Sequence, residues 1–283
     1  MVKIIDCPRD AMQGIKTFIP TEKKIEYLNQ LLKVGFDTLD FGSFVSPKAI
    51  PQLRDTAEVV KALDVSATKT KLLSIIANER GARDASKFEK ISYLGYPFSI
   101  SETFQKRNTN AGLNESLKRL EKIKIISDSS EKQLVVYITM AFGNPYYDEW
   151  DFSIVYKWVK RLVDMGIDII VMSDTVGLSN KAIISEVFKG IIPAFPDVEF
   201  GAHFHTKPHT WREKMESAFE SGCRRYDGAL KGYGGCPMSG YGLVGNMSTE
   251  NIIRFMQDIG EDTGLDIIQL KIAMEMASDF FPK

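Results

Sequence analysis

The chain has 283 residues, of which 44% are hydrophobic and 26% charged, an ordinary composition for a globular protein with a substantial core. With 36 basic and 37 acidic residues the formal net charge is −1, so bulk attraction to nucleic acid or to a membrane surface is not expected. No apolar run reaches a spanning helix, the start lacks a signal-peptide pattern, and three widely spaced cysteines argue against a disulfide framework, so we expect a reduced, soluble, cytoplasmic protein.

Short apolar segments that favour strands alternate along the chain with amphipathic segments that favour helices. The first strand pattern, Val2–Ile5, ends before Pro8, which cannot donate a ladder hydrogen bond. The nearly all-apolar Asp168–Met172 is typical of a strand in a parallel sheet that is covered on its outer face. The other expected strands are Thr38–Phe41, Lys71–Ile76, a fourth region at Lys90–Leu94 and Phe98–Ser101, Gln133–Ala141, Val198–Ala202 and Arg225–Gly228.

Apolar residues recur at helical spacing between these strands. Thr21 caps a helix that runs to Gly35. The further expected helices are Gln52–Leu63, Ala82–Lys90, Leu113–Ser127, Phe152–Met165, Asn180–Ile192, Thr210–Ser221, Thr249–Ile259 and Leu265–Asp279. The last helix has an apolar face that could pack on the core or form a dimer contact, made of Leu265, Ile268, Ile272 and Met276.

The alternation amounts to nearly eight strand-then-helix units, which is the size of an α/β (β/α)8 TIM barrel. Neither a low-complexity linker nor a break in composition divides the chain, so residues 1–283 are predicted to form a single catalytic barrel with a C-terminal helix. A doubly wound open sheet is the alternative. The first strand is not followed by the glycine-rich phosphate loop that this alternative would favour.

Two of the three histidines, His203 and His205, stand two residues apart beside an expected strand. Residues at i and i+2 of a strand point to the same side, so the two imidazoles can hold one metal ion together. The plainer interpretation is a pair of hydrogen-bonded histidines near the surface. Other polar residues follow the expected strands at the same end of the barrel: Arg9, Asp10, Asp40, Ser43, Ser101, Glu102, Ser173, Asp174, Thr175 and Asn246.

Asp10, His203, His205 and Asn246 would offer two imidazole nitrogens and two oxygens, a set that favours an octahedral Mg or Mn ion over a closed thiolate zinc site. Cys236 lies in the loop segment Gly234–Pro237, whose glycines would let it close over a substrate. A reactive acid or base is favoured there over a small buried hydrophobe. Cys7 and Cys223 are predicted to be packing residues.

Several segments resemble 3-hydroxy-3-methylglutaryl-CoA lyase, a family of the metal-dependent TIM-barrel lyases and Claisen-condensing enzymes. The similarity extends from the first strand to the eighth helix, and the more specific marks are Ser43–Lys48 and Gly234–Pro237. The segments that carry it are Pro8–Gln13, Ser43–Lys48, Ser101–Asn108, Ser173–Gly177, His203–His205, Gly234–Pro237 and Gly245–Glu250.

The resemblance implies cleavage of 3-hydroxy-3-methylglutaryl-CoA to acetoacetate and acetyl-CoA, as in leucine degradation and ketone-body formation. Asp10, His203, His205 and Asn246 would hold the divalent cation, Mg or Mn, which would polarise substrate oxygens. Arg9 would stabilise charge on the thioester oxygen, supported by Asp40, and Cys236 would protonate the enolate carbon. The same likeness gives the substrate-binding residues as Gln13, Ser43, Lys48, Asp174 and Thr175, with Lys48 toward the CoA phosphates or simply solvated.

The chain departs from the family pattern at several positions. Ala11 replaces a usual glycine, Asp40 is one methylene shorter than the usual glutamate, and Asn144 replaces a cysteine. Thr206 stands where an aspartate usually follows the two histidines. Thr206 and Asp40 keep open a related lyase or condensing enzyme for another short acyl-CoA or 2-oxo acid. A further alternative is a silent barrel that binds a metal or an acyl-CoA, and the presence of Cys236 with Arg9 argues against it. The expected partners are an acyl-CoA substrate and a second copy of the chain in a homodimer.

Overall fold

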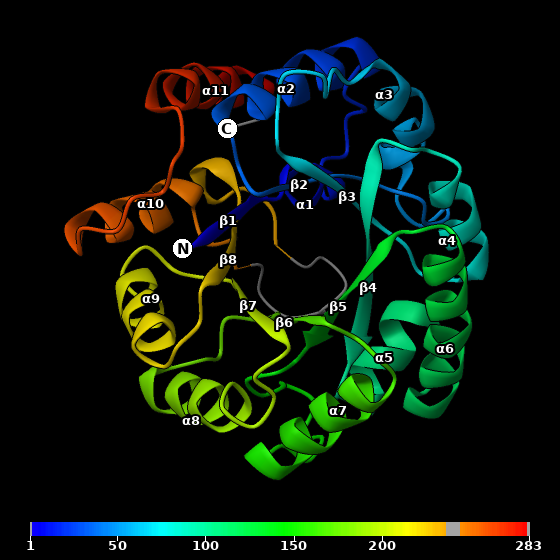
Figure 1. Ribbon diagram of the computed structural model, residues 1–283, viewed down its shortest axis with the longest axis vertical. Coiled ribbons are helices and arrows are strands. Elements are labelled where there is room, and N and C mark those ends of the chain that lie inside the picture. The colour runs from blue at the N-terminus through cyan, green and yellow to red at the C-terminus, as the bar shows by residue number, and fades with distance from the viewer. Residues whose placement is uncertain (1, 236–243, 282–283) are drawn as a thin grey trace.

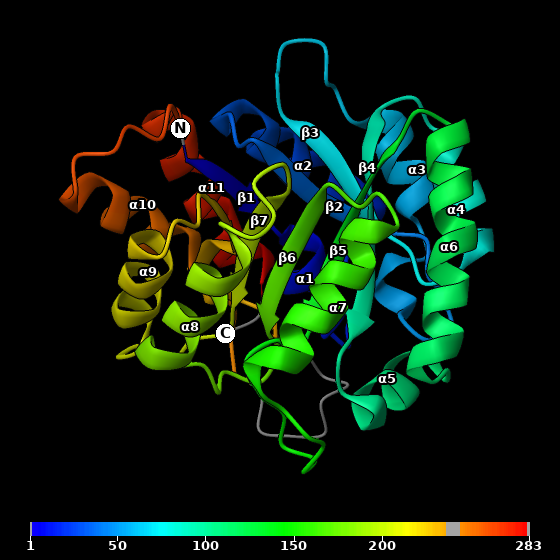
Figure 2. The ribbon, with the colours of Figure 1, turned by 60° about the horizontal axis from the view of Figure 1, so that its bottom comes forward.

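Eight parallel strands close into a barrel in which neighbours in sequence are neighbours in space and β8 returns to pair with β1. The computed structural model describes residues 2–235 and 244–281. Figures 1 and 2 show the helices on the outside of this ring of strands. The expected (β/α)8 barrel is confirmed. The strands are β1 (Lys3–Asp6), β2 (Thr38–Ser43), β3 (Lys71–Ile75), β4 (Ile91–Ser99), β5 (Gln133–Thr139), β6 (Ile169–Asp174), β7 (Glu199–Phe204) and β8 (Arg225–Gly228).

The helices follow the strands in the order that the sequence pattern predicts. They are α1 (Pro8–Gln13), α2 (Thr21–Val34), α3 (Thr56–Ala62), α4 (Glu79–Ser86), α5 (Glu102–Thr109), α6 (Leu113–Ser129), α7 (Phe152–Asp164), α8 (Lys181–Ile191), α9 (Trp211–Glu220), α10 (Thr249–Asp258) and α11 (Ile267–Phe280). Short 3₁₀ turns lie at Pro51–Leu53 and Leu230–Gly232. None of the helices among residues 2–235 and 244–281 is long and apolar enough to cross a membrane.

Alternation along the strands divides the apolar residues into two layers. Side chains that point outward meet the helices and form the larger core, as Val136 and Ile138 of β5 do. Side chains that point inward come from strands alone and fill the barrel: Leu73, Ile75, Tyr93, Val135, Tyr137, Ile169 and Val171. The inward positions toward the carboxyl ends of the strands hold polar residues instead. The apolar layer therefore supports a polar layer above it.

Two helices and several strand ends differ from the sequence prediction. The short helix α1 begins at Pro8, whose missing N–H costs nothing in a first turn, and α5 is capped by the Ser101 side chain, which accepts from the Phe104 N–H. The two expected pieces of the fourth strand region are one continuous strand, β4, that pairs with β5 through Pro97. The sixth and seventh strands each extend two residues beyond Met172 and Ala202, because the polar residues at their ends still pair in the sheet.

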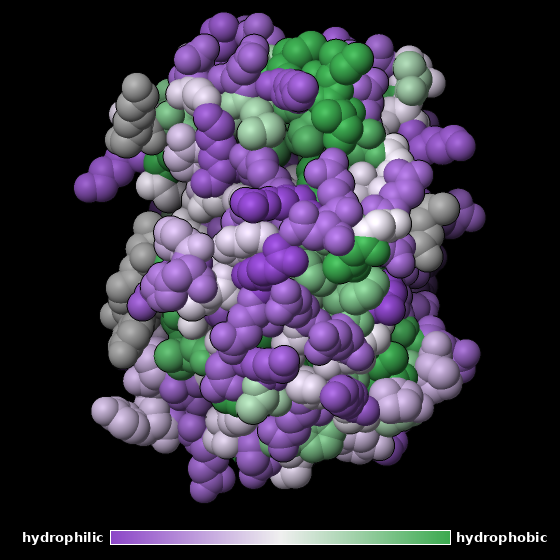
Figure 3. Space-filling model, turned by 90° about the vertical axis from the view of Figure 1, so that its left-hand side faces the viewer, coloured by the Kyte–Doolittle hydropathy of each residue, from purple (hydrophilic) through white to green (hydrophobic). Residues whose placement is uncertain are grey.

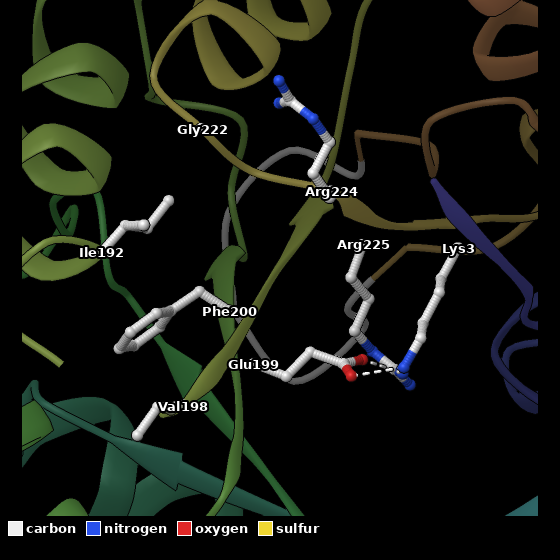
Figure 4. A pocket seen from close by; sticks show the side chains of 8 residues that line it. All are labelled: Lys3, Ile192, Val198, Glu199, Phe200, Gly222, Arg224 and Arg225. Carbon is white, nitrogen blue, oxygen red and sulfur yellow. Dashed lines mark hydrogen bonds and ion pairs between the residues drawn. The ribbon is translucent and has the colours of Figure 1, made fainter. Parts of the chain in front are cut away.

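Ion pairs close the amino-terminal end of the barrel, opposite the polar layer. Glu199 of β7 accepts from Lys3 of β1 and from Arg225 of β8, at 2.8 Å for the Arg225 Nη1 atom. Figure 4 shows these side chains meeting at the edge of a pocket of about 250 Å³, whose wall also includes Arg224. Charged residues at this end of a TIM barrel contribute to stability rather than to catalysis.

The C-terminal helix α11 packs on α2. Its buried side is made by Leu270, Ala273 and Ala277. Of the apolar face identified in the sequence, Leu265 and Met276 pack partly against the core, whereas Ile268 and Ile272 are exposed. Figure 3 shows a hydrophobic patch at the end of the molecule that α11 occupies in Figure 1.

Candidate active site

The carboxyl ends of the strands bring the expected ligand residues together. Asp10 lies in the first turn of α1, His203 is the second-last residue of β7, and His205 pairs with Asn246 through an isolated bridge. The rings of His203 and His205 lie on the same side, with their centroids 5.4 Å apart. One potential ligand atom from each of Asp10, His203 and His205 lies within 4.8 Å of the other two. Residues distant in sequence thus form one cluster with the spacing of a metal site.

Asn246 contacts the cluster through its amide nitrogen and leaves its amide oxygen unpaired among residues 2–235 and 244–281. Its Nδ2 donates to Asp10 Oδ2 at 2.7 Å and to the Tyr233 carbonyl at 2.8 Å. Its buried Oδ1 has no hydrogen-bond partner among residues 2–235 and 244–281. The backbone packs closely here, since a Cβ on Gly234 would lie 2.6 Å from Asn246 Nδ2. A buried oxygen that accepts no hydrogen bond can instead bind a cation. The two imidazoles and the carboxylate near Asn246 offer further ligands for the same cation.

The charge states of His205 and Asp10 suit a cation, whereas burial is outweighed at His203 by Asp227, which raises the pKa of that ring. Burial and the neighbouring His203 lower the pKa of His205 to about 4, so its ring is neutral at pH 7 and can offer a lone pair. Burial alone would raise the pKa of Asp10, but Arg9 and the two histidines outweigh it and lower that pKa. Neutral imidazole and ionised carboxylate are the forms that bind metals. The donor set therefore fits a divalent ion.

Arg9 is fixed beside this cluster by three side chains. Its Nε and Nη2 atoms donate to Asp40 Oδ2 at 3.0 and 2.5 Å, a two-pronged contact. Its Nη1 atom donates to Asp10 Oδ1 at 2.9 Å and to Gln13 Oε1 at 3.0 Å. Burial opposes the charge, yet the carboxylates of Asp40 and Asp10 raise the pKa of Arg9 above its ordinary value. The guanidinium is a fixed positive charge next to the ligand cluster.

Three other expected site residues use their polar atoms within the protein. Ser43 donates from its hydroxyl to the Ile75 carbonyl at 3.1 Å, and the Thr175 hydroxyl accepts from the Met140 N–H at 2.9 Å. Asp174 accepts from the Ser179 hydroxyl at 2.6 Å and from Lys214 at 2.5 Å. The hydrogen bonds of Ser43 and Thr175 join the ends of adjacent strands, and those of Asp174 join the end of β6 to α9.

Two expected site residues remain, Lys48 and Cys236. Lys48 is exposed on the loop that follows β2. Cys236 lies outside the described residues, which end at Gly235 and resume at Val244. Cys7 and Cys223 are buried free thiols, as the sequence interpretation expected of packing residues.

Two buried charged residues at the site were not identified from the sequence. Asp227 of β8 approaches His203, with Oδ2 3.3 Å from the ring Nδ1. Lys214 of α9 donates to Asp174 and, at 2.9 Å, to the backbone carbonyl of His205. An acidic residue inside an expected strand was the available signal for Asp227. A lysine on an amphipathic helix gives no such signal, because that position is usually solvated.

The fold and the site together define a (β/α)8 barrel with a histidine and carboxylate centre at the carboxyl ends of its strands. A family model described as HMGL-like matches residues 1–276. A hydroxymethylglutaryl-CoA lyase of Bacillus subtilis is 31% identical over 93% of this chain and 87% of its own length. A rat protein named 3-hydroxy-3-methylglutaryl-CoA lyase, cytoplasmic, is 31% identical over 100% of this chain and 80% of its own.

Solved structures of HMG-CoA lyases also superpose on this chain. The Bacillus subtilis HMG-CoA lyase superposes with a TM-score of 0.92 at 30% identity, covering 99% of this chain and 93% of that one. An Acinetobacter baumannii HMG-CoA lyase, solved with coenzyme A and 3-methylmalate, gives a TM-score of 0.91 at 28% identity, covering 99% and 91%. The chain belongs to the HMGL-like family. The family expected from the sequence motifs is confirmed.

Proposed function

We propose that this protein is a carbon–carbon lyase that cleaves 3-hydroxy-3-methylglutaryl-CoA to acetoacetate and acetyl-CoA with the help of a divalent metal ion. The observation that carries the proposal is the cluster of Asp10, His203, His205 and Asn246 beside the fixed guanidinium of Arg9. Relatives that match 93% and 100% of this chain are named as lyases of this substrate.

The ion would be held by Asp10, His203, His205 and Asn246, and Mg or Mn suits their mixture of nitrogen and oxygen donors. When bound, it would act as a Lewis acid toward the carboxylate and hydroxyl oxygens of the substrate. Two features of the side chains support this assignment. Asn246 is held by Asp10 and Tyr233 so that its oxygen stays available, and His205 is neutral.

Arg9 is suited to stabilise the negative charge that develops on the thioester oxygen. Because Asp40 and Gln13 hold its guanidinium in place, little reorganisation is needed when that charge appears. When the 3-hydroxyl of the substrate loses its proton to a base, the C–C bond breaks, the ketone of acetoacetate forms and the enolate of acetyl-CoA is left. The enolate must then gain a proton at carbon, which balances the proton lost by the hydroxyl. We assign the transfer of that proton to the Cys236 thiol, which is one of the few side chains with a suitable acidity.

Recognition of the substrate is assigned to Gln13, Ser43, Lys48, Asp174 and Thr175. Exposed Lys48 can reach CoA phosphates in solvent. Ser43, Asp174 and Thr175 act by shaping the wall, since their polar atoms are bonded within the protein. The relative from Acinetobacter baumannii was solved with coenzyme A, which supports an acyl-CoA substrate for this chain.

We also propose that the protein is a homodimer and that it is cytoplasmic. The exposed isoleucines Ile268 and Ile272 on α11 support an apolar contact between two copies. Relatives are named for two locations: the rat protein is named cytoplasmic, and one from Macaca fascicularis is named mitochondrial. A role in leucine degradation and ketone-body formation would follow from the products.

A substrate panel tests the proposed reaction against its alternatives. Purified protein with Mg or Mn is given 3-hydroxy-3-methylglutaryl-CoA, shorter 3-hydroxyacyl-CoA esters, and acetyl-CoA paired with 2-oxo acids, and all products are quantified. Release of acetoacetate and acetyl-CoA from the first substrate alone is expected. Turnover of a different member of the panel would assign the site to another acyl-CoA. The comparison matters because Thr206 follows the two histidines at the position where the family pattern usually has an aspartate.

A further inference from the structure

Asp227 faces the same interior layer of the barrel as His203. The parallel register of β7 and β8 places the two residues directly opposite each other. Asp227 is 2% exposed, and its Oδ2 atom lies 3.3 Å from His203 Nδ1. Because this contact engages Nδ1, the ring nitrogen left for an ion is Nε2. The reaction proposed above uses Asp227 for neither binding nor proton transfer.

A second charged residue lies below Asp227. Arg225, two residues earlier on β8, points to the same side of the strand and interacts electrostatically with Asp227 and Tyr137. Among residues 2–235 and 244–281, four buried polar atoms here have no hydrogen-bond partner: Asp227 Oδ1, Arg225 Nε, Arg225 Nη2 and Tyr137 Oη. Buried polar groups of this kind are ordinarily satisfied by ordered water. The unpaired Asp227 oxygen therefore lies near donors of Arg225 and Tyr137, to which ordered water can connect it.

We propose that Asp227 is a positioning residue for His203. Its carboxylate accepts the Nδ1 proton, which fixes the tautomer and the ring plane and leaves the Nε2 lone pair directed at the cation site. Carboxylates that hold metal-binding histidines in this way typically change metal affinity by about 10–100-fold when removed. The inference rests on the proposed function, because it takes His203 to be a metal ligand. Arg225 supplies the positive charge that offsets a carboxylate inside the barrel.

The geometry also offers a competing role for Asp227. Ligand atoms of Cys7, His203 and Asp227 lie within 4.8 Å of one another, so these three residues could form a deeper metal site. Burial raises the pKa of the Cys7 thiol well above its ordinary value, which opposes the thiolate that such a site requires. The contact between Asp227 and Nδ1 would also have to break. The orienting role needs neither change.

The histidine content of the chain allows a direct test in the intact protein. With only three histidines, ¹⁵N-labelled imidazoles can be assigned by single substitution, and His209 serves as an internal reference. In metal-free protein at alkaline pH, where the ring is neutral, wild-type His203 is expected to carry its proton on Nδ1. Asp227→Ala should shift that proton toward Nε2. The conservative variant Asp227→Asn, which keeps an acceptor oxygen, should retain the wild-type tautomer.

Mn²⁺ binding, followed by electron paramagnetic resonance, gives the second measurement. Asp227→Ala is expected to weaken the Mn²⁺ Kd by about 10–100-fold and Asp227→Asn by less. Asp6→Asn is the matched control, because Asp6 is a buried carboxylate of β1 that bonds Thr249 and not the site. Cys7→Ala should bind like the wild type. A loss of affinity in Cys7→Ala would overturn the orienting role in favour of the deeper metal site.

An unchanged tautomer in Asp227→Ala would overturn the proposal, and so would an unchanged Kd in the folded variant. If Asp227→Ala does not fold, Asp227→Val, which also removes the acceptor and suits a strand, carries the same comparison, with an unchanged tautomer as the contradicting result. If the proposed metal site itself is wrong, these measurements give different results. Wild-type protein would then bind no Mn²⁺, or His203→Ala would bind it as tightly as the wild type, while the tautomer would still report on Asp227.

Discussion

Cys236 is the residue to which we assign the proton transfer. A thiol that protonates the enolate carbon is needed for turnover but not for holding the ion or the substrate. We therefore expect Cys236→Ala to lower kcat by about 10²–10⁴-fold, the usual contribution of a general acid, with Mn²⁺ affinity little changed. Cys223→Ala is the control, since Cys223 is a buried thiol just before β8, at the end of the barrel opposite the ligand cluster. A near-normal kcat in Cys236→Ala would remove the assigned role.

Asp6 couples stability to pH at a position outside the ligand cluster. One of its oxygens accepts from the Thr249 hydroxyl at 2.6 Å, while Oδ2 has no partner among the described residues. Burial raises the pKa of Asp6 to about 8, from 3.8 for an exposed carboxyl. The folded protein therefore holds a proton that the unfolded chain releases. This contribution to stability is complete below about pH 4 and is lost as the pH rises toward 8.

Urea unfolding at pH 5 and pH 8 measures this coupling. Relative to the wild type, Asp6→Asn should gain stability on the order of a few kcal/mol between the two values, because its amide stays neutral throughout. Both proteins share all other titrating groups, so the difference isolates Asp6. A parallel loss of stability in wild type and variant would show that Asp6 titrates normally.

At the scale of elements, Lys214 joins α9 to the ends of β6 and β7. It is 2% exposed and donates to Asp174 and to the His205 carbonyl. Lys214→Met would leave the Asp174 carboxylate buried without its cation, which should cost about 3–5 kcal/mol of unfolding free energy. Lys160→Met is the control, because Lys160 forms only an exposed pair with Asp164 on α7 and should change stability by about 0.5 kcal/mol or less. Chemical denaturation of the two variants gives the comparison, and equal effects would contradict this role.

The sequence predicts elements well where apolar periodicity is strong. The run Asp168–Met172 marks β6 because a covered parallel strand is apolar along its length. The ends of β6 and β7 were placed too early, since Ser173 and His203 are polar yet still pair in the sheet. Helices α1 and α5 carried weaker signals, a proline at N1 and a serine cap, without an apolar stripe long enough to stand out.

The site was predictable as far as position in the barrel determines it. Asp10, His203, His205 and Asn246 each lie just past a strand or at its end, so the topology alone brings them to one end. The roles of Asp227 and Lys214 depend instead on contacts between side chains of different elements. The acidic residue type inside a strand was a signal for Asp227, whereas nothing in the sequence pattern marks Lys214. Sequence reasoning also placed Asp174 at the site without revealing that Lys214 and Ser179 occupy its oxygens.

At the scale of the whole molecule, the exposed face of α11 predicts association. Ile268 is 71% exposed, as is Ile125 on α6 at 68%, so the two residues form a matched pair of substitutions. Ile268→Lys should convert a dimer to monomers in light scattering, because a charge in an apolar contact is costly. Ile125→Lys should leave the dimer intact. A monomeric wild type, or a dimer that survives Ile268→Lys, would rule out this face as the interface.

Acyl-CoA cleavage that depends on a divalent ion held by the histidine pair is the central claim, and one assay addresses it directly. Acetyl-CoA released from 3-hydroxy-3-methylglutaryl-CoA is measured for chelator-treated protein, before and after Mg or Mn is restored, beside His203→Ala. Wild-type activity should disappear with chelation and return with the metal, whereas His203→Ala should stay inactive and bind less metal. Full activity in metal-free protein, or none in folded protein loaded with metal, would contradict the claim.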